Sequence, residues 1–447
     1  MLNMAMLYAS KVGSILVGIL ILPQFSHLLG PYQFGVAAVI LSIQALLLML
    51  DLGMSTLVGR DVAACGSRQA QAAQSWQTSN LVLTAFYGAM APLAWVLNFA
   101  FGQPLTGLQL TACLVLFWAL TLQNVGQVAL IAGSRFKAAS GIQLVGVLAR
   151  ALATLAALQA LGANLTVFVT AQALCAVLQW AATHLSCQRL FATAGPQRGE
   201  LRSRAAQALT MLKRGGHVVL FGLAGAAVMQ LDKPLVSALA SAAATAPYYL
   251  ATVLCLTPLS TLAGPVAQFF QPRLIQAITA GDDAAVHKSL VPFTTALVLI
   301  TFVPSALLWL LREPIVGAWL GHVANSTQVA HYTGILLPGA AVGALGYLPY
   351  SILVARQDFR FQAVASACLT LLTLTAAAAC AQRGSIDGVC WVYASYHCVS
   401  TVGSWLRCIY LDRGETRHAK AAGLRAIGLA AAVSLPAVVI ALGTQYS

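Results

Sequence analysis

Long apolar runs alternate with short polar stretches along the whole chain. Each run extends over about twenty residues, the length that a helix needs to cross the hydrocarbon core of a bilayer. The runs are continuous rather than alternating, so they predict membrane helices and exclude a membrane β-barrel. The thirteen predicted spans cover residues 5–29, 34–58, 77–101, 108–133, 141–161, 166–186, 217–241, 247–272, 291–311, 331–354, 362–380, 388–410 and 424–443.

The connections between these spans differ in charge from one side to the other. Nineteen of the 24 Lys and Arg residues lie in or beside 59–76, 134–140, 187–216, 273–290, 355–361 and 411–423. The opposite set, which is almost uncharged, comprises 30–33, 102–107, 162–165, 242–246, 312–330 and 381–387. Because cytoplasmic loops are rich in Lys and Arg, the N-terminus is predicted to be cytoplasmic. The formal net charge of +13 then reflects topology and not nucleic-acid binding.

Composition supports a polytopic helical membrane protein, since 59% of the 447 residues are hydrophobic and only 8% are charged. The first run is too long for a cleaved signal peptide, so it is predicted to stay as a span. The ten Cys residues form no Cys-x-x-Cys pair, and no metal or other cofactor is expected. The last run, 424–443, is either a thirteenth crossing or an interfacial helix, and we expect a crossing.

The spans group into two halves. We predict an N-terminal lobe over 1–188, a basic cytoplasmic linker over 189–216, a C-terminal lobe over 217–410, and a loop with an additional hydrophobic helix over 411–447. The linker either binds anionic lipid headgroups or, as we favour, joins the lobes and enforces topology through its charge.

Asp232-Lys233-Pro234 interrupts the seventh predicted span. Each charge costs roughly 2.5–3.5 kcal/mol at the centre of a membrane helix. Neighbours in sequence point about 100° apart on a helix, so each charge is expected to need a partner of its own. Pro234 disfavours helical geometry at Lys233 and predicts a kink there.

Several patches resemble a known family. They are Leu29-Gly30-Pro31 with Phe34-Gly35, Asp51-Leu52-Gly53-Met54, Arg60-Asp61-Val62-Ala63, Asp232-Lys233-Pro234-Leu235-Val236 and Ala246-Pro247-Tyr248-Tyr249-Leu250-Ala251. Their order and spacing are similar to those of Wzx-type flippases of the multidrug/oligosaccharidyl-lipid/polysaccharide (MOP) exporter superfamily. Pro247, where the family more often has Gly, and the extra C-terminal span depart from that pattern.

The resemblance implies an all-α fold with two six-helix lobes in a V around a central cavity, like that of MATE transporters, and alternating access. It also implies a substrate: an undecaprenyl-pyrophosphate-linked oligosaccharide moved across the bacterial inner membrane for polysaccharide or O-antigen assembly. A proton or sodium counter-ion and other polysaccharide-assembly membrane proteins are the partners that it suggests.

Three cations within spans are candidates for holding the pyrophosphate: Arg150, Lys233 and Lys11. Arg150 lies about 13 Å into its span at 1.5 Å per residue, so it should face the bundle interior and could grip phosphate oxygens in a bidentate manner. The alternative is a structural pair between Arg150 and Asp51 or Asp232. Lys11 lies about one turn into its span, and could instead snorkel to the interface.

Two acids within spans, Asp232 and Asp51, are candidates for ion coupling or for structural pairing. Asp51 shares a predicted helical face with Gln44 and Ser55, which suits a cavity wall. It also opens an Asp-Leu-Gly-Met turn near the inner end of its span, where it could equally bond a neighbouring helix. Arg60 and Asp61 are expected to form an inner gate or to anchor a loop.

Uncharged polar side chains form stripes that could contact sugars. The candidates are Gln44, Asn124, Gln127, Thr261 and Gln268. Hydrogen bonds between helices are the alternative role, and the commoner one.

Two other classes of function remain as alternatives. A glycan polymerase or ligase would need catalytic residues at the outer face, and no such motif is present, so we do not expect an enzyme. A MATE-type drug/cation antiporter is the closer rival, but it would favour acidic residues over fixed cations in the cavity. The sequence leaves open the sugar unit, the coupling ion and the oligomeric state.

Overall fold

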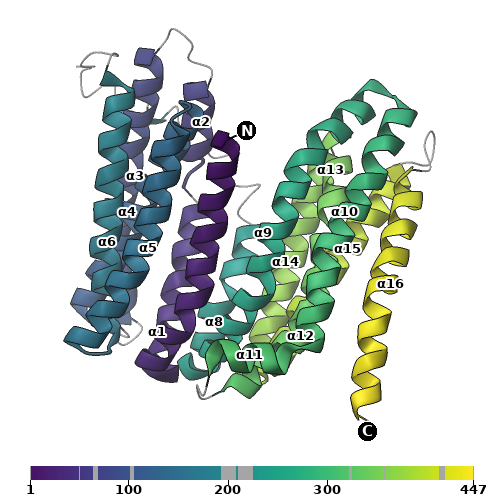
Figure 1. Ribbon diagram of the computed structural model, residues 1–447. Helices are drawn as coiled ribbons and strands as arrows, with labels where there is room; N and C mark the ends of the chain where they lie inside the picture. The colour runs from purple at the N-terminus through teal and green to yellow at the C-terminus, as the bar shows by residue number, and fades with distance from the viewer. Residues whose placement is uncertain are drawn as a thin grey trace. The chain divides into compact units, whose positions relative to one another are not determined.

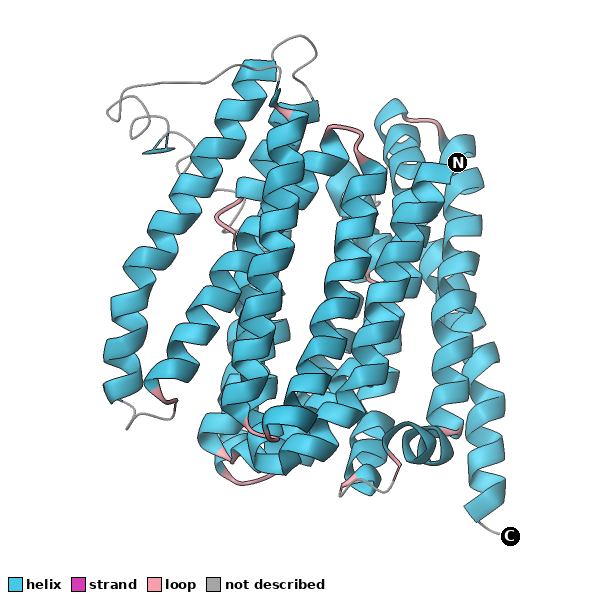
Figure 2. Cartoon of the chain, turned by 60° about the vertical axis from the view of Figure 1, so that its left-hand side comes forward, coloured by secondary structure: helices cyan, strands magenta, loops and turns pink. Residues whose placement is uncertain are grey.

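The computed structural model describes residues 2–49, 51–63, 69–100, 105–192, 208–209, 225–321, 325–356, 358–411 and 418–445. Within these ranges every element is an α-helix (Figure 2). The chain forms two compact units, Met1–Pro234 and Leu235–Ser447. The predicted linker 189–216 lies mostly outside the described residues, and the predicted lobe boundaries stay predictions.

Unit 1 is a bundle of long helices, drawn in purple to teal in Figure 1. In it, α4 packs against α6, and α5 packs against both α1 and α6. Its main helices are α1 (Leu2–Met49), α2 (Met54–Ala63), α3 (Gln69–Ala100), α4 (Gly107–Ala132), α5 (Phe136–Leu161) and α6 (Leu165–Leu190).

The first two predicted spans meet without a loop. Both lie largely in α1, where two helices join at a kink at Gly30, whose φ of 71° and ψ of 169° are not helical. Pro31 follows directly, and a proline is well suited to the first turn of a helix because its missing N–H is not needed there. The predicted connection 30–33 is therefore a kink within one element.

The second predicted span is not continuous to residue 58. The helix α1 ends at Met49 and α2 begins at Met54. Between them Leu52 and Gly53 have positive φ values of 56° and 72°, which a right-handed helix does not tolerate. The predicted Asp51-Leu52-Gly53-Met54 turn is therefore present, and it separates two helices.

Unit 2 is also a helical bundle. In it, α12 packs against α9 and α15, and α10 packs against α9 and α16. The short helix α8 (Asp232–Leu239) spans the boundary between the units. The helices that follow are α9 (Ala242–Ala280), α10 (Asp283–Leu310), α11 (Arg312–Leu320), α12 (Ser326–Ala344), α13 (Tyr347–Ala355), α14 (Phe359–Gln382), α15 (Ile386–Leu411) and α16 (His418–Gln445).

Several predicted loops in unit 2 are largely helical. In the predicted connection 273–290 only Gly281 and Asp282 lie outside the helices, because α9 and α10 continue well past their apolar segments. Residues 242–246 form the first turns of α9, whose N-terminus is capped by Ser241 Oγ. Residues 312–330 contain α11. Hydropathy reports where a chain meets hydrocarbon, whereas helices can extend beyond that layer into the interface.

The helices α12 and α15 approach each other closely. A Cβ placed on Gly339 would lie 2.5 Å from the Cα of Ala394, and one placed on Gly343 would lie 2.6 Å from His397 Nδ1. Small residues spaced four apart allow this approach, in which dispersion contacts stabilise helix pairs within a membrane.

The described helices include nine that are long and apolar enough to cross a membrane. They are Leu16–Met49, Ala70–Ala100, Gly107–Ala132, Phe136–Leu161, Leu165–Leu190, Ala242–Ala280, Asp283–Leu310, Ser326–Ala355 and Arg360–Gln382. The predicted multi-pass class is therefore confirmed. The helices α15 and α16 coincide with the predicted spans 388–410 and 424–443, whose crossing stays a prediction.

Candidate functional site

A buried ion pair lies at the start of α8. Lys233 Nζ is 2.8 Å from Asp232 Oδ2, and the two side chains are only 6% and 3% exposed. Lys233 Nζ also donates a hydrogen bond to the carbonyl oxygen of Met229 at 3.1 Å. The prediction that each charge needs a partner of its own is therefore wrong.

The reason is a break in the helix. Leu231 is not helical, and Asp232 is the first residue of α8. The Lys233 side chain folds back across this break towards Met229, where it meets the carboxylate of Asp232. The predicted kink exists, but it lies at Leu231, and Pro234 occupies the first turn of α8, where proline is tolerated.

Asp51 lies in the turn between α1 and α2 and caps the start of α2. Its Oδ1 accepts a hydrogen bond from the backbone N–H of Gly53, and its Oδ2 accepts one from the N–H of Ser55, both at 3.0 Å. The predicted stripe of Gln44, Asp51 and Ser55 on one helix is wrong, because Gln44 lies in α1 and Ser55 in α2. The contacts of Asp51 are those of a local cap.

Arg150 lies in the middle of α5. Its Nη1 is buried and has no hydrogen-bond partner in the described part of the chain. Nor do the described residues include an ion-pair partner for its guanidinium, so the alternative of a pair with Asp51 or Asp232 is not realised. Residues 62–199 contain no Asp or Glu at all, which leaves α3 to α6 without a carboxylate.

Glutamine side chains join α4, α5 and α6. Gln123 Nε2 donates to Gln143 Oε1 at 3.1 Å, which links α4 to α5. Gln127 Nε2 donates to the carbonyl oxygen of Ala139 at 3.0 Å, so this candidate sugar contact makes a bond between helices. Gln179 of α6 is buried against α5. Gln123, Gln143 and Gln179 were not predicted as site residues. The spacing of four residues between Gln123 and Gln127 on α4 was a visible signal for Gln123, whereas Gln179 is placed only by the packing of α6 on α5.

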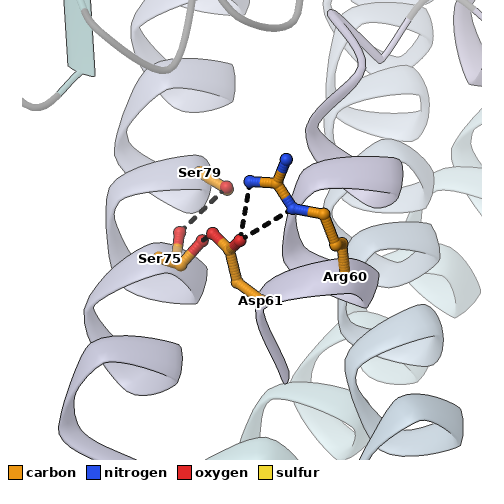
Figure 3. A network of polar contacts seen from close by, with 4 residues as sticks. All are labelled: Arg60, Asp61, Ser75 and Ser79. Carbon is orange, nitrogen blue, oxygen red and sulfur yellow. Dashed lines mark hydrogen bonds and ion pairs between the residues drawn. The ribbon is translucent and has the colours of Figure 1, made fainter. Parts of the chain in front are cut away.

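Arg60 and Asp61 form part of a network that ties α2 to α3 (Figure 3). Asp61 Oδ1 accepts hydrogen bonds from Arg60 Nε and Nη2 at 3.2 and 2.9 Å. Its Oδ2 accepts one from Ser75 Oγ at 2.8 Å, and Ser79 Oγ donates to the carbonyl oxygen of Ser75. Since Arg60 and Asp61 lie on α2 and Ser75 and Ser79 on α3, these contacts are those of an anchor between the two helices.

The remaining predicted residues are dispersed. Thr261 of α9 donates to the carbonyl oxygen of Thr257 at 2.7 Å, and Gln268 is exposed on the same helix. Asn124 is half-buried on α4, and Gln44 has a buried Oε1 without a partner among the described groups. Lys11 belongs to α1, but its side chain lies outside the described residues.

The sequence matches one known family. The family described as polysaccharide biosynthesis protein matches residues 25–328. No curated protein matches the sequence.

Solved structures share the fold. A multidrug resistance MATE family transporter of the MOP superfamily, in an inward-facing conformation, matches with a TM-score of 0.69 and 14% identity, covering 90% of this chain and 96% of its own. The lipid II flippase MurJ, in an inward closed conformation, matches with a TM-score of 0.72 and 10% identity, covering 98% and 92%. A MOP superfamily transporter from Pyrococcus furiosus matches with a TM-score of 0.63 and 14% identity, covering 92% and 95%. Identities this low show the fold alone. The structural matches confirm the predicted MATE-like, multi-span helical class.

Proposed function

This chain belongs to the polysaccharide biosynthesis protein family, and from that premise we propose that it is a flippase for a lipid-linked oligosaccharide. The cargo is an oligosaccharide on undecaprenyl pyrophosphate, carried across the bacterial inner membrane for polysaccharide or O-antigen assembly. The fold shared with MurJ, itself described as a lipid II flippase, supports transport of a glycan on a lipid carrier. The reaction is transport, without covalent chemistry on the cargo.

The charge inside unit 1 is the single observation that carries this proposal. Arg150 has a buried guanidinium nitrogen without a partner in the described chain, and no carboxylate is present on α3 to α6. Asp51 is occupied as a helix cap, and Asp232 pairs with Lys233. An uncompensated cation suits a pyrophosphate, whereas a drug/cation antiporter would need an available carboxylate.

The proposed roles follow from these contacts. Arg150 holds phosphate oxygens by charge-assisted hydrogen bonds. Lys233 exchanges its bond to Asp232 for a cargo phosphate, and Asp232, once released, takes up the coupling proton or sodium ion. The ion pair thus links cargo binding to ion binding.

Transport in vesicles tests the proposal. Purified protein in liposomes should move a fluorescent undecaprenyl-pyrophosphate oligosaccharide between leaflets, and Arg150→Ala should slow this movement. Loss of a charge-assisted hydrogen bond of about 1.5–3 kcal/mol corresponds to a roughly 10- to 100-fold lower rate.

The matched control is Arg189→Ala, which removes the same charge from the exposed end of α6 and should flip cargo at the wild-type rate. Normal flipping by Arg150→Ala would show that the cationic site is not used. Exchange of organic cations without movement of the lipid-linked glycan would instead establish the antiporter.

A further inference from the structure

The interface between α5 and α6 carries three polar side chains besides Arg150, namely Thr154 on α5 and Cys175 and Gln179 on α6. The two helices are antiparallel, joined by the turn 162–164. Gly146 of α5 meets Gln179 of α6 so closely that a Cβ on Gly146 would lie 2.3 Å from Gln179 Cδ. Arg150 follows Gly146 by one turn on α5, and Cys175 precedes Gln179 by one turn on α6. The Arg150 guanidinium lies near Cys175. Thr154 follows Arg150 by another turn on α5, on the same helical face.

These groups leave hydrogen-bonding capacity unused. Arg150 Nη1, Thr154 Oγ1 and Gln179 Oε1 are all buried, and each lacks a hydrogen-bond partner in the described structure. Thr154 is 0% exposed and Gln179 is 5% exposed, so bulk water does not reach them. Native proteins leave few buried polar groups unsatisfied. Two of these atoms, Arg150 Nη1 and Thr154 Oγ1, lie one turn apart on the same face of α5 and together indicate a ligand.

The ligand must be negatively charged. A buried cation is retained only with a counter-charge, and residues 62–199 supply no carboxylate. The hydroxyl of Thr154 and the guanidinium N–H groups of Arg150 are donors, which is what an anion requires.

We propose that Arg150 and Thr154, which lie one turn apart on α5 at its interface with α6, bind a small inorganic anion of the size of chloride. The close contact at Gly146 leaves the two helices tightly packed, which favours a compact ligand over a bulky one. Binding of this anion needs no cargo, although the site shares Arg150 with the proposed transport function. An anion at Arg150 would compensate the guanidinium charge within unit 1 and compete with a cargo phosphate for the same donors.

Chloride titration of the purified protein in detergent tests the site. Sodium gluconate is replaced stepwise by sodium chloride at constant ionic strength, and the melting temperature is followed by tryptophan fluorescence. A ligand that binds only the folded state raises the melting temperature in a saturable manner. Wild type should show such a rise of a few degrees, and Arg150→Gln should show none.

Two further variants make the result specific. Arg189→Gln, at the exposed end of α6, should respond to chloride like wild type. Thr154→Val should shift the titration midpoint to several-fold higher chloride, and Thr154→Ser should restore it, so the site can be tested even if Arg150→Gln does not fold.

A melting temperature that does not change with chloride would overturn the proposal, as would a rise that persists in Arg150→Gln. A rise produced by inorganic pyrophosphate but not by chloride would also overturn the small-anion site. That last result would leave Arg150 to the cargo, so failure of this proposal is distinguishable from failure of the transport proposal.

Discussion

Asp232 and Lys233 are neighbours in sequence that meet because the helix is broken beside them. The break at Leu231 allows the lysine to bond both Asp232 and the carbonyl of Met229. On an uninterrupted helix the same two side chains would diverge by about 100°. Local backbone geometry, and not residue identity, therefore decides which charges pair.

Removing one member of this pair should be costly. Lys233→Ala leaves a buried carboxylate without its counter-charge, and breaking a buried pair in this way costs about 3–5 kcal/mol. Thermal unfolding of the detergent-solubilised protein should show a markedly lower melting temperature for Lys233→Ala and for Asp232→Ala.

The double variant Asp232→Ala with Lys233→Ala should recover much of this loss, because no uncompensated charge is then buried. Losses that simply add in the double variant would mean that the two side chains are not energetically coupled.

Asp51 shows what residue-level reasoning from sequence could not reach. It is one of two acids predicted within the spans, and the sequence is compatible both with a place in a cavity wall and with a bond to a neighbouring helix. The turn at Leu52 and Gly53 was predicted, but the actual partners of Asp51 are the N–H groups of Gly53 and Ser55, which depend on a new helix starting directly after that turn.

Helix ends and helix contacts belong to the scale of the element. Gly339 lies at the contact between α12 and α15, where the backbone of Ala394 occupies the place that a side chain would need. Neither hydropathy nor charge distinguishes this glycine from others in the spans. Only the partner helix gives it a role, so the contact could not be predicted from one sequence without its fold.

Gly339→Ala should separate α12 from α15. A methyl group only 2.5 Å from a Cα must displace the backbone, and overpacking of this kind costs about 1–3 kcal/mol. Thermal unfolding or limited proteolysis of the purified variant measures the loss.

The control is Gly403→Ala on α15, where nothing lies within 4 Å of an added Cβ. This substitution should be neutral or slightly stabilising, because alanine is the better helix former by about 1 kcal/mol. Equal behaviour of the two variants would contradict the close contact.

At the scale of the whole molecule, long apolar runs and the asymmetry of basic loops were sufficient to predict a multi-pass helical protein. They were sufficient because membrane thickness imposes a length and the inner surface imposes a charge. The polar groups around Arg150 were harder to predict. Thr154 follows Arg150 by one turn on α5, a spacing that the sequence shows. Gln179 meets α5 only through the register of α5 and α6, which one sequence does not show.

The C-terminal helix provides a test of the predicted topology. α16 has 28 residues, or about 42 Å at 1.5 Å per residue, which is enough to cross a hydrocarbon core of about 30 Å. With thirteen crossings, alkaline phosphatase fused after Ser447 should be active and green fluorescent protein should be dark. The reverse pattern would place the C-terminus in the cytoplasm and leave α16 at the interface.

The ion pair at the start of α8 has an electrical consequence. A membrane potential does work on net charge, about 2.3 kcal/mol for each elementary charge moved across 100 mV. Asp232 and Lys233 carry opposite charges 2.8 Å apart, so the broken segment has no net formal charge while they stay together. The voltage therefore does almost no work on that segment when its depth in the bilayer changes. Arg150 carries a net charge whenever no anion accompanies it, so the voltage does work when Arg150 changes its depth.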